Sequence, residues 1–206
     1  MQSISAAMRG GVHAEDPPIA KFLFSSTKMA WFWLVVRLYV GYEWLEAGLH
    51  KVQDPNGAWS FGNGSAILGY WQKAVAIPAA PAKPAITFDW FRGFLQFLID
   101  NGAHTWMGGL VAYGELLVGI GLILGGLVGI AAFFGALMNM NFMLAGSAST
   151  NPLLFFVAIG LILSWKIAGY YGLDRVLLPV LGTPWHGTQA SRAPTPTVGT
   201  PAARTA

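Results

Sequence analysis

Between Trp106 and Tyr170 the chain reads WMGGLVAYGELLVGIGLILGGLVGIAAFFGALMNMNFMLAGSASTNPLLFFVAIGLILSWKIAGY. Only two side chains in this run, Glu115 and Lys166, carry a charge. A domain of this size that faces water needs many more charged residues to solvate its surface. The run therefore predicts a chain that lies in a lipid bilayer.

Glycine-centred breaks divide this run into segments of similar length. The breaks lie at Gly125-Gly126 and from Gly146 to Asn151, and they leave apolar segments at 106–124, 127–145 and 152–170. A fourth apolar segment, 29–49, precedes them. Each segment has about 19 to 21 residues, enough for a helix to cross a hydrocarbon layer roughly 30 Å thick. The sequence thus predicts an all-α fold, a polytopic membrane bundle of four helices.

The composition agrees with this class and excludes several functions. The chain is 54% hydrophobic and 10% charged, with a mean hydropathy of +0.52, and it lacks the polar–apolar alternation of membrane β-strands. It has no cysteine, which rules out disulfides, thiolate catalysis and sulfur-ligated metals. The net charge is +3 without any Lys/Arg cluster, so nucleic acid is not an expected partner.

The expected organisation follows from the apolar segments. Residues 1–28 read as a largely flexible cytoplasmic segment without a signal-peptide pattern, 29–178 as the four-helix transmembrane domain, and 179–206 as a disordered tail. Lysines at 21, 28 and 166 flank the bundle on one side, whereas the turn at 146–151 carries no positive charge. The positive-inside rule then places both termini of a multi-pass cell-membrane protein in the cytoplasm, although basic residues in the long first loop weaken that assignment.

The long first loop, 50–105, is predicted to be extracytoplasmic and partly helical. Ser65 is expected to cap a short helix, and apolar residues recur at helical spacing from Trp90 to Leu98. Asp89, Arg92, Gln96 and Asp100 fill much of the opposite face of this second helix. The pattern is typical of a helix that lies on the outer leaflet or packs over the bundle, and the sequence does not decide between these two.

The first span carries polar residues on two faces. At 100° per residue Arg37, Gly41 and Gly48 share one face, and the glycines would let another helix approach. An arginine about two turns inside the bilayer is expected to face that neighbour, or else to extend its side chain to the cytoplasmic interface.

The other face of the first span raises the question of a metal site. Glu43, Glu46 and His50 have ligand types at a suitable spacing, but a bundle site would need further ligands from facing helices. We therefore expect no metal. We expect instead a hydrated mouth on the outer side, formed by Glu46, His50, Lys51 and His104.

Glu115 is the conspicuous residue of the second span, because a carboxylate near mid-bilayer usually has a partner or a role. Arg37, Glu115 and Asn139 are predicted to lie at comparable depth, where a charge pair hydrogen-bonded by an amide would satisfy its members. Such a site would receive a carbonyl ligand beside Trp44 and Tyr113. The alternative is an ion pair that only sets the packing of the helices.

These residues resemble those of a known family. The first span reads R37-x3-G41-x6-G48-x2-K51, and the second carries G114-E115-L-L-V-G119 and ends in L-I-L-G125. This pattern, with four helices and a long loop after the first, resembles the DoxX/DoxD membrane family over roughly 28–178. The chain departs from the family at Gly125-Gly126, where members often have a basic residue.

The resemblance implies a function. DoxD-type members are the membrane subunit of thiosulfate:quinone oxidoreductase, and other relatives assist thiol-redox or oxidative-stress complexes. The resemblance nominates Arg37 and Glu115 as site residues, with quinone as a substrate, no covalently bound cofactor, and a second subunit as a further partner. The expected function is a quinone-interacting oxidoreductase subunit that takes electrons from a small anionic reductant such as thiosulfate. The alternatives are a non-catalytic scaffold or accessory subunit and a small transporter.

Overall fold

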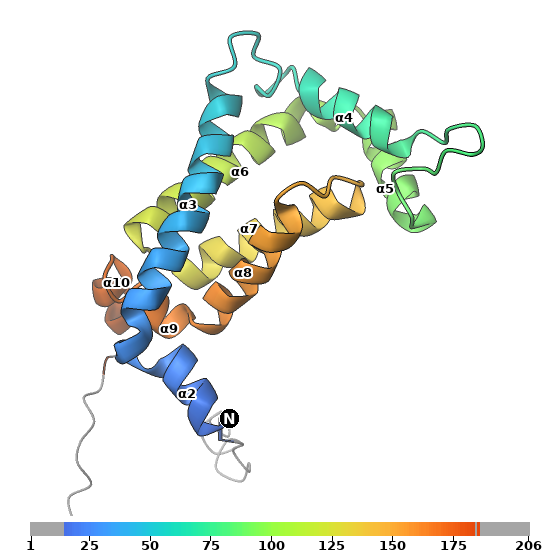
Figure 1. The fold of residues 1–206 in the computed structure, drawn as a ribbon. Helices are drawn as coiled ribbons and strands as arrows, with labels where there is room; N and C mark the ends of the chain where they lie inside the picture. Colours follow the sequence, from blue (N-terminus) through green and yellow to red (C-terminus); the bar gives the residue numbers. More distant parts are fainter. Residues whose placement is uncertain (1–14, 184, 186–206) are drawn as a thin grey trace, which may run out of the picture.

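The computed structural model describes residues 15–183 and 185, and this part of the chain contains nine α-helices, one short 3-10 helix and no strand (Figure 1). The prediction of an all-α fold is confirmed. The elements in order are α2 Pro18–Ser25, η2 Thr27–Met29, α3 Ala30–Val52, α4 Ser65–Val75, α5 Asp89–Asp100, α6 His104–Leu124, α7 Val128–Leu144, α8 Asn151–Leu163, α9 Trp165–Ala168 and α10 Asp174–Val180.

Length and composition single out α6 as a membrane-spanning candidate. This helix has 21 residues and is apolar enough to cross a bilayer, and α2 with η2–α3 gives a second candidate if the two are taken as one span bent by 55°. Helices α7 and α8 are apolar but shorter, with 17 and 13 residues. Among the described residues there are thus one or two helices of membrane length.

The expected fourth span, 152–170, is not one continuous helix. Helix α8 ends at Leu163, and α9 begins at Trp165. Between them the buried Ser164 hydroxyl donates a hydrogen bond of 2.8 Å to the carbonyl of Gly160. The backbone N–H of Ser164 bonds the same carbonyl at 2.9 Å, so the hydroxyl adds a second bond at the end of α8. A serine that bonds the carbonyl four residues before it often bends a helix, and apolar periodicity does not record such a bond.

Helical structure extends into both segments that the sequence reads as flexible or disordered. The segment 1–28 was predicted to be largely flexible, yet α2 and η2 give residues 18–29 helical structure. Helix α10 extends to Val180, past the predicted start of the disordered tail. The remaining expectations, flexibility of 1–14 and disorder of 186–206, lie outside the described residues.

Helices α3 and α6 are in direct backbone contact (Figure 1). A Cβ atom at Gly48 of α3 would lie 2.5 Å from the backbone nitrogen of Leu116, and one at Gly119 of α6 would lie 2.5 Å from that of Leu45. No larger residue fits at either position without separating the helices. This is the close approach that small residues allow between helices, and it fixes the register of α3 against α6.

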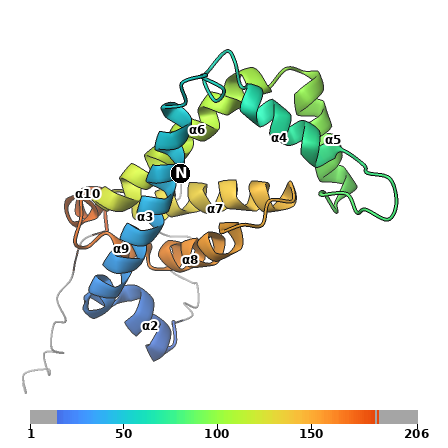
Figure 2. The same ribbon diagram turned by 45° about the horizontal axis from the view of Figure 1, so that its top comes forward.

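Helices α6 and α7 form a hairpin whose arms diverge from their connection at Gly125-Gly126 (Figures 1 and 2). Helix α6 packs on α3, and α7 packs on α8. We call the end at Gly125-Gly126 the turn end. We call the other end, where α4 and α5 lie beside the start of α6, the loop end. One apolar core lies among α3, α6, α7, α8 and α9, and a second lies at the loop end around Trp71 and Phe91.

The first loop contains α4 and α5, at the positions where the sequence predicts helices. The predicted cap is wrong, because Ser65 is the first residue of α4 and the cap position is held by Gly64 with a φ of 61°. A Cβ atom at Gly64 would also lie 1.8 Å from the carbonyl oxygen of His104. Glycine is therefore needed at this point both for its backbone conformation and for its contact with α6.

Candidate functional site

Glu115 is paired with Lys51. The Oε2 atom of Glu115 lies 2.6 Å from Nζ of Lys51, and the two side chains are 2% and 20% exposed. Gly48 brings the α3 backbone against α6 at Glu115 and Leu116, so the lysine near the end of α3 reaches the carboxylate directly. The acid at the centre of α6 thus has a buried partner whose amino group lies toward the loop end.

The hypothesised pair between Arg37 and Glu115 is wrong. Arg37 is buried and donates hydrogen bonds from its guanidinium to the carbonyls of Leu122, Ile123 and Tyr171, the last two at 2.7 and 3.0 Å. Leu122 is about 10 Å from Glu115 along α6, since the helix rises 1.5 Å per residue. Arg37 therefore lies at the turn end and Lys51 at the loop end. Its burial also excludes the alternative that it extends to an aqueous interface.

Asp174 is a buried acid that the sequence reasoning missed. Its carboxylate accepts hydrogen bonds from the backbone N–H groups of Leu127 and Val128, at 2.6 and 3.0 Å. The N–H groups at the start of a helix have no acceptor within that helix, and a negative charge is favourable there. The acid and its partners are separated by 46 and 47 positions in the sequence, so no local capping pattern marks it.

Asn139 and Trp44 form a polar layer beside the ion pair. Asn139 is fully buried, and neither its amide atoms nor Nε1 of Trp44 have a hydrogen-bond partner among the described residues. A Cβ atom at Gly135, one turn before Asn139, would lie 3.1 Å from Nε1 of Trp44. A Cβ atom at Gly114 would lie 3.6 Å from Sδ of Met138. Glu115 directly follows Gly114, and Asn139 directly follows Met138. Glu115 and Asn139 are therefore at the same level along α6 and α7.

The remaining predicted residues lie apart from this layer. Tyr113 is 46% exposed and stacks on Phe61. His50 and Glu46 are on the outside of α3, with exposed side chains 3.8 Å apart. His104 lies under the loop at Gly64, and its Nδ1 atom is buried. The predicted mouth is therefore divided, because Lys51 faces inward while Glu46 and His50 face outward. No cluster of three His, Cys, Asp or Glu residues suited to a metal exists in the described part of the chain.

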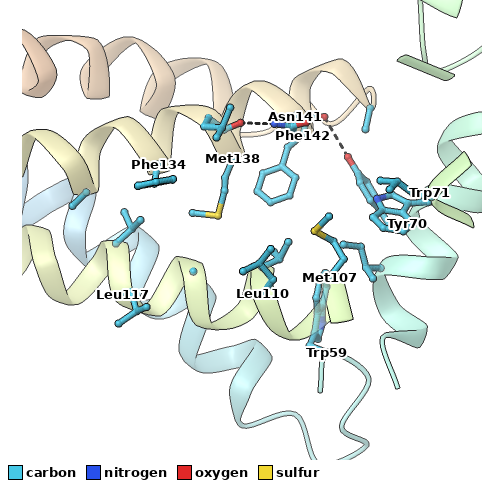
Figure 3. A pocket seen from close by; sticks show the side chains of 18 of the residues that line it. Trp59, Tyr70, Trp71, Met107, Leu110, Leu117, Phe134, Met138, Asn141 and Phe142 are labelled. Carbon is cyan, nitrogen blue, oxygen red and sulfur yellow. Dashed lines mark hydrogen bonds between the residues drawn. The ribbon is translucent and has the colours of Figure 1, made fainter. Parts of the chain in front are cut away.

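A large cavity lies between the diverging arms of the α6–α7 hairpin (Figure 3). Its volume is about 740 Å³, and α4 and α5 bound it at the loop end. Its lining includes Ile67, Tyr70, Trp71, Phe91, Phe94, Met107, Leu110, Val111, Leu117, Phe134, Met138, Asn141 and Phe142. None of the described residues that line it is charged. Sequence reasoning missed this cavity, because it depends on the angle between α6 and α7, which no local pattern gives.

A single indole ring separates the ion pair from the cavity. Trp59 lines the cavity, and the Lys51 ammonium lies 5.1 Å from the centroid of the same ring. A cation over the face of a tryptophan is attracted by the ring quadrupole. The Lys51–Glu115 pair thus holds the wall of the cavity without being part of its lining.

The phenol of Tyr70 is a neutral hydrogen-bonding group at the loop end of the cavity. Its hydroxyl donates to the carbonyl of Phe142 at 3.2 Å, as the dashed line in Figure 3 shows. Burial raises the pKa of Tyr70, so the phenol keeps its proton at neutral pH.

We expect Lys51→Met to be strongly destabilising, because it leaves the Glu115 carboxylate buried without a partner. The loss should be about 3–5 kcal/mol. Glu115→Leu should be milder, since the partly exposed Lys51 can turn toward solvent, and the double variant should lose less than the sum of the two. Unfolding of each purified variant in mixed micelles measures these differences.

The control for this experiment is Asp89→Ala, which removes an exposed partner of Arg92 and should leave stability almost unchanged. Equal stability of Lys51→Met and the wild type would show that the pair contributes nothing to the fold.

Comparison of the chain with protein-family models, with curated proteins and with solved structures finds no match. The likeness to the DoxX/DoxD family therefore rests on the residues quoted above.

Proposed function

We propose that this chain is a multi-pass membrane protein in which α3, α6, α7 and the broken helix α8–α9 cross the bilayer. The proposal is supported by the large apolar side chains that these helices leave exposed. Outside the lining of the cavity they include Val35, Leu38, Leu124, Phe133, Leu153, Phe156 and Ile159. Water would disfavour so much apolar surface, whereas lipid tails would cover it. Short α7 spans about 26 Å, a mismatch that local thinning of the bilayer accommodates.

In this arrangement the two termini are cytoplasmic and α4–α5 lies on the opposite side. Lys21, Lys28 and Lys166 flank the turn end, in keeping with the positive-inside rule. Helix α5 carries exposed aromatic side chains, Trp90, Phe94 and Phe97, which are suited to the interface of the outer leaflet.

Labelling of single introduced cysteines tests this topology. A cysteine at Lys83, in the loop between α4 and α5, should react with a membrane-impermeant maleimide in intact cells. A cysteine at Lys28 should react only after the membrane is made permeable. The reverse pattern would overturn the orientation, and reaction of both positions from outside would show that α3 does not cross the bilayer.

We further propose that the cavity binds an isoprenoid quinone, and that the protein is the quinone-interacting subunit of a membrane oxidoreductase. The observation that carries this proposal is the uncharged cavity of about 740 Å³ between α6 and α7. Pockets for small organic ligands have volumes of roughly 300–1,000 Å³ and are mostly apolar. Leu117 and Phe134 line the cavity and are also exposed, so the cavity reaches the lipid-facing surface from which a quinone would enter.

The electron donor in this proposal is a small anion such as thiosulfate, as the family resemblance implies. An accessory role without catalysis is the second candidate, favoured by the absence of charged side chains from the lining. In that role the protein would hold quinone for a partner subunit that performs the chemistry.

A variant that fills the cavity tests the binding of quinone. Gly114→Phe should place a ring in the cavity, because a Cβ atom there makes only an ordinary contact, 3.6 Å from Met138. We expect binding of decylubiquinone by the purified protein to weaken at least about tenfold, which corresponds to 1.4 kcal/mol. The matched control is Leu124→Phe on the same helix, at an exposed position outside the lining.

Equal binding by the wild type and Gly114→Phe would overturn the proposed site. A wild type that binds quinone but does not reduce it with thiosulfate would exclude catalysis by this chain alone and support the accessory role.

A further inference from the structure

The two ends of the cavity differ in polarity. The lining side chains with nitrogen or oxygen atoms are Trp59, Tyr70, Trp71 and Asn141, and all four lie at the loop end. Toward the turn end the lining is hydrocarbon, from Leu117, Ile120, Leu127, Ile130 and Phe134. Figure 3 shows this division, with Trp59, Tyr70 and Trp71 on one side and Leu117 and Phe134 on the other. A molecule that fills the whole cavity must match both environments.

The polar end offers both donors and acceptors without any charge. The indole groups of Trp59 and Trp71 are donors, and the Tyr70 oxygen can accept a hydrogen bond while its proton is given to Phe142. Carbonyl oxygens or hydroxyl groups on a flat ring complement these groups, and aromatic walls favour stacking of such a ring.

The absence of charge from the lining selects against ionic head groups. A phosphate placed there would be desolvated with no opposite charge in the lining, which is strongly unfavourable. Arg92, the arginine of α5, is not part of the lining, and its guanidinium already bonds Asp89 and the carbonyl of Ile86.

We infer that the ligand is an uncharged amphiphile with one polar ring and one apolar chain, bound with its ring at Trp59, Tyr70 and Trp71. Its chain runs along α6 and α7 toward the turn end and leaves the cavity between Leu117 and Phe134. This inference rests on the proposed binding of a lipophilic membrane molecule and adds the direction of that molecule.

Two photoreactive probes of the same benzoquinone with a decyl chain test the direction. One probe carries an azide on the ring, and the other carries a diazirine at the end of the chain. Each is photolysed with the full-length protein in phosphatidylcholine nanodiscs, and the labelled residues are located by mass spectrometry. The ring probe should label Trp59 and the α4 residues Tyr70 and Trp71, whereas the chain probe should label positions near Leu117, Ile130 and Phe134.

The controls separate failure of the direction from failure of the binding site. Excess unlabelled decylubiquinone, and the Gly114→Phe substitution, should each reduce both patterns at least about fivefold. Exchanged patterns would overturn the direction and leave the site in place. Labelling by both probes that neither control reduces would overturn the site itself. Efficient labelling of the cavity by a diazirine phosphatidylcholine, without competition from quinone, would identify a phospholipid as the occupant and contradict both inferences.

Discussion

The fold depends on the hydrogen bonds that satisfy the backbone groups of two buried helix ends, the end of α6 and the start of α7, at the Gly125-Gly126 turn. The last carbonyls of α6 and the first N–H groups of α7 lie within a few residues of each other, and neither set has partners inside its own helix. Arg37, which is 1% exposed, donates to the carbonyls, and Asp174, also 1% exposed, accepts from the amides. Each charge also opposes the dipole end it contacts. Four parts of the chain, α3, α6, α7 and residues 171–174 at the start of α10, are joined at this one turn.

The shape of the cavity follows from this junction. The hairpin is fixed at its turn end, and its two helices pack on different neighbours. Helix α6 packs on α3 through the contacts at Gly48 and Gly119, and α7 packs on α8. The arms therefore separate toward the loop end, where α4 and α5 lie beside the opening (Figure 2). The Lys51–Glu115 pair lies in the contact between α6 and α3, outside the lining of the cavity and behind the indole of Trp59. Charge is thus kept out of the space that an uncharged ligand would occupy.

Much of the fold could be predicted from the sequence, and less of the site. Hydropathy located α3, α6 and α7 to within a few residues because each is bounded by glycines or polar residues. The break at Ser164 was missed because the residues on both sides of it are apolar, so hydropathy does not change at the break. Glu115 and Asn139 were correctly expected to be buried. The partner predicted for Glu115, Arg37, was wrong. Periodicity gives the face of a helix on which a residue lies, but not which residue of a neighbouring helix lies at the same level along the axis. Asp174 and the cavity depend on contacts between distant segments and on the angle between helices, which no local pattern records.

Unfolding of Arg37→Met, Asp174→Asn and the double variant, titrated with SDS in mixed micelles, tests the role of the capped turn most directly. Each single change leaves buried backbone or charged groups without partners and should lower the free energy of unfolding by about 2–4 kcal/mol. The double variant should lose less than the sum, because both residues hold the same turn. Arg175→Met, which removes a charge that only lies over the ring of Tyr170, is the control and should change stability little. Wild-type stability in both single variants would show that the fold does not depend on this turn.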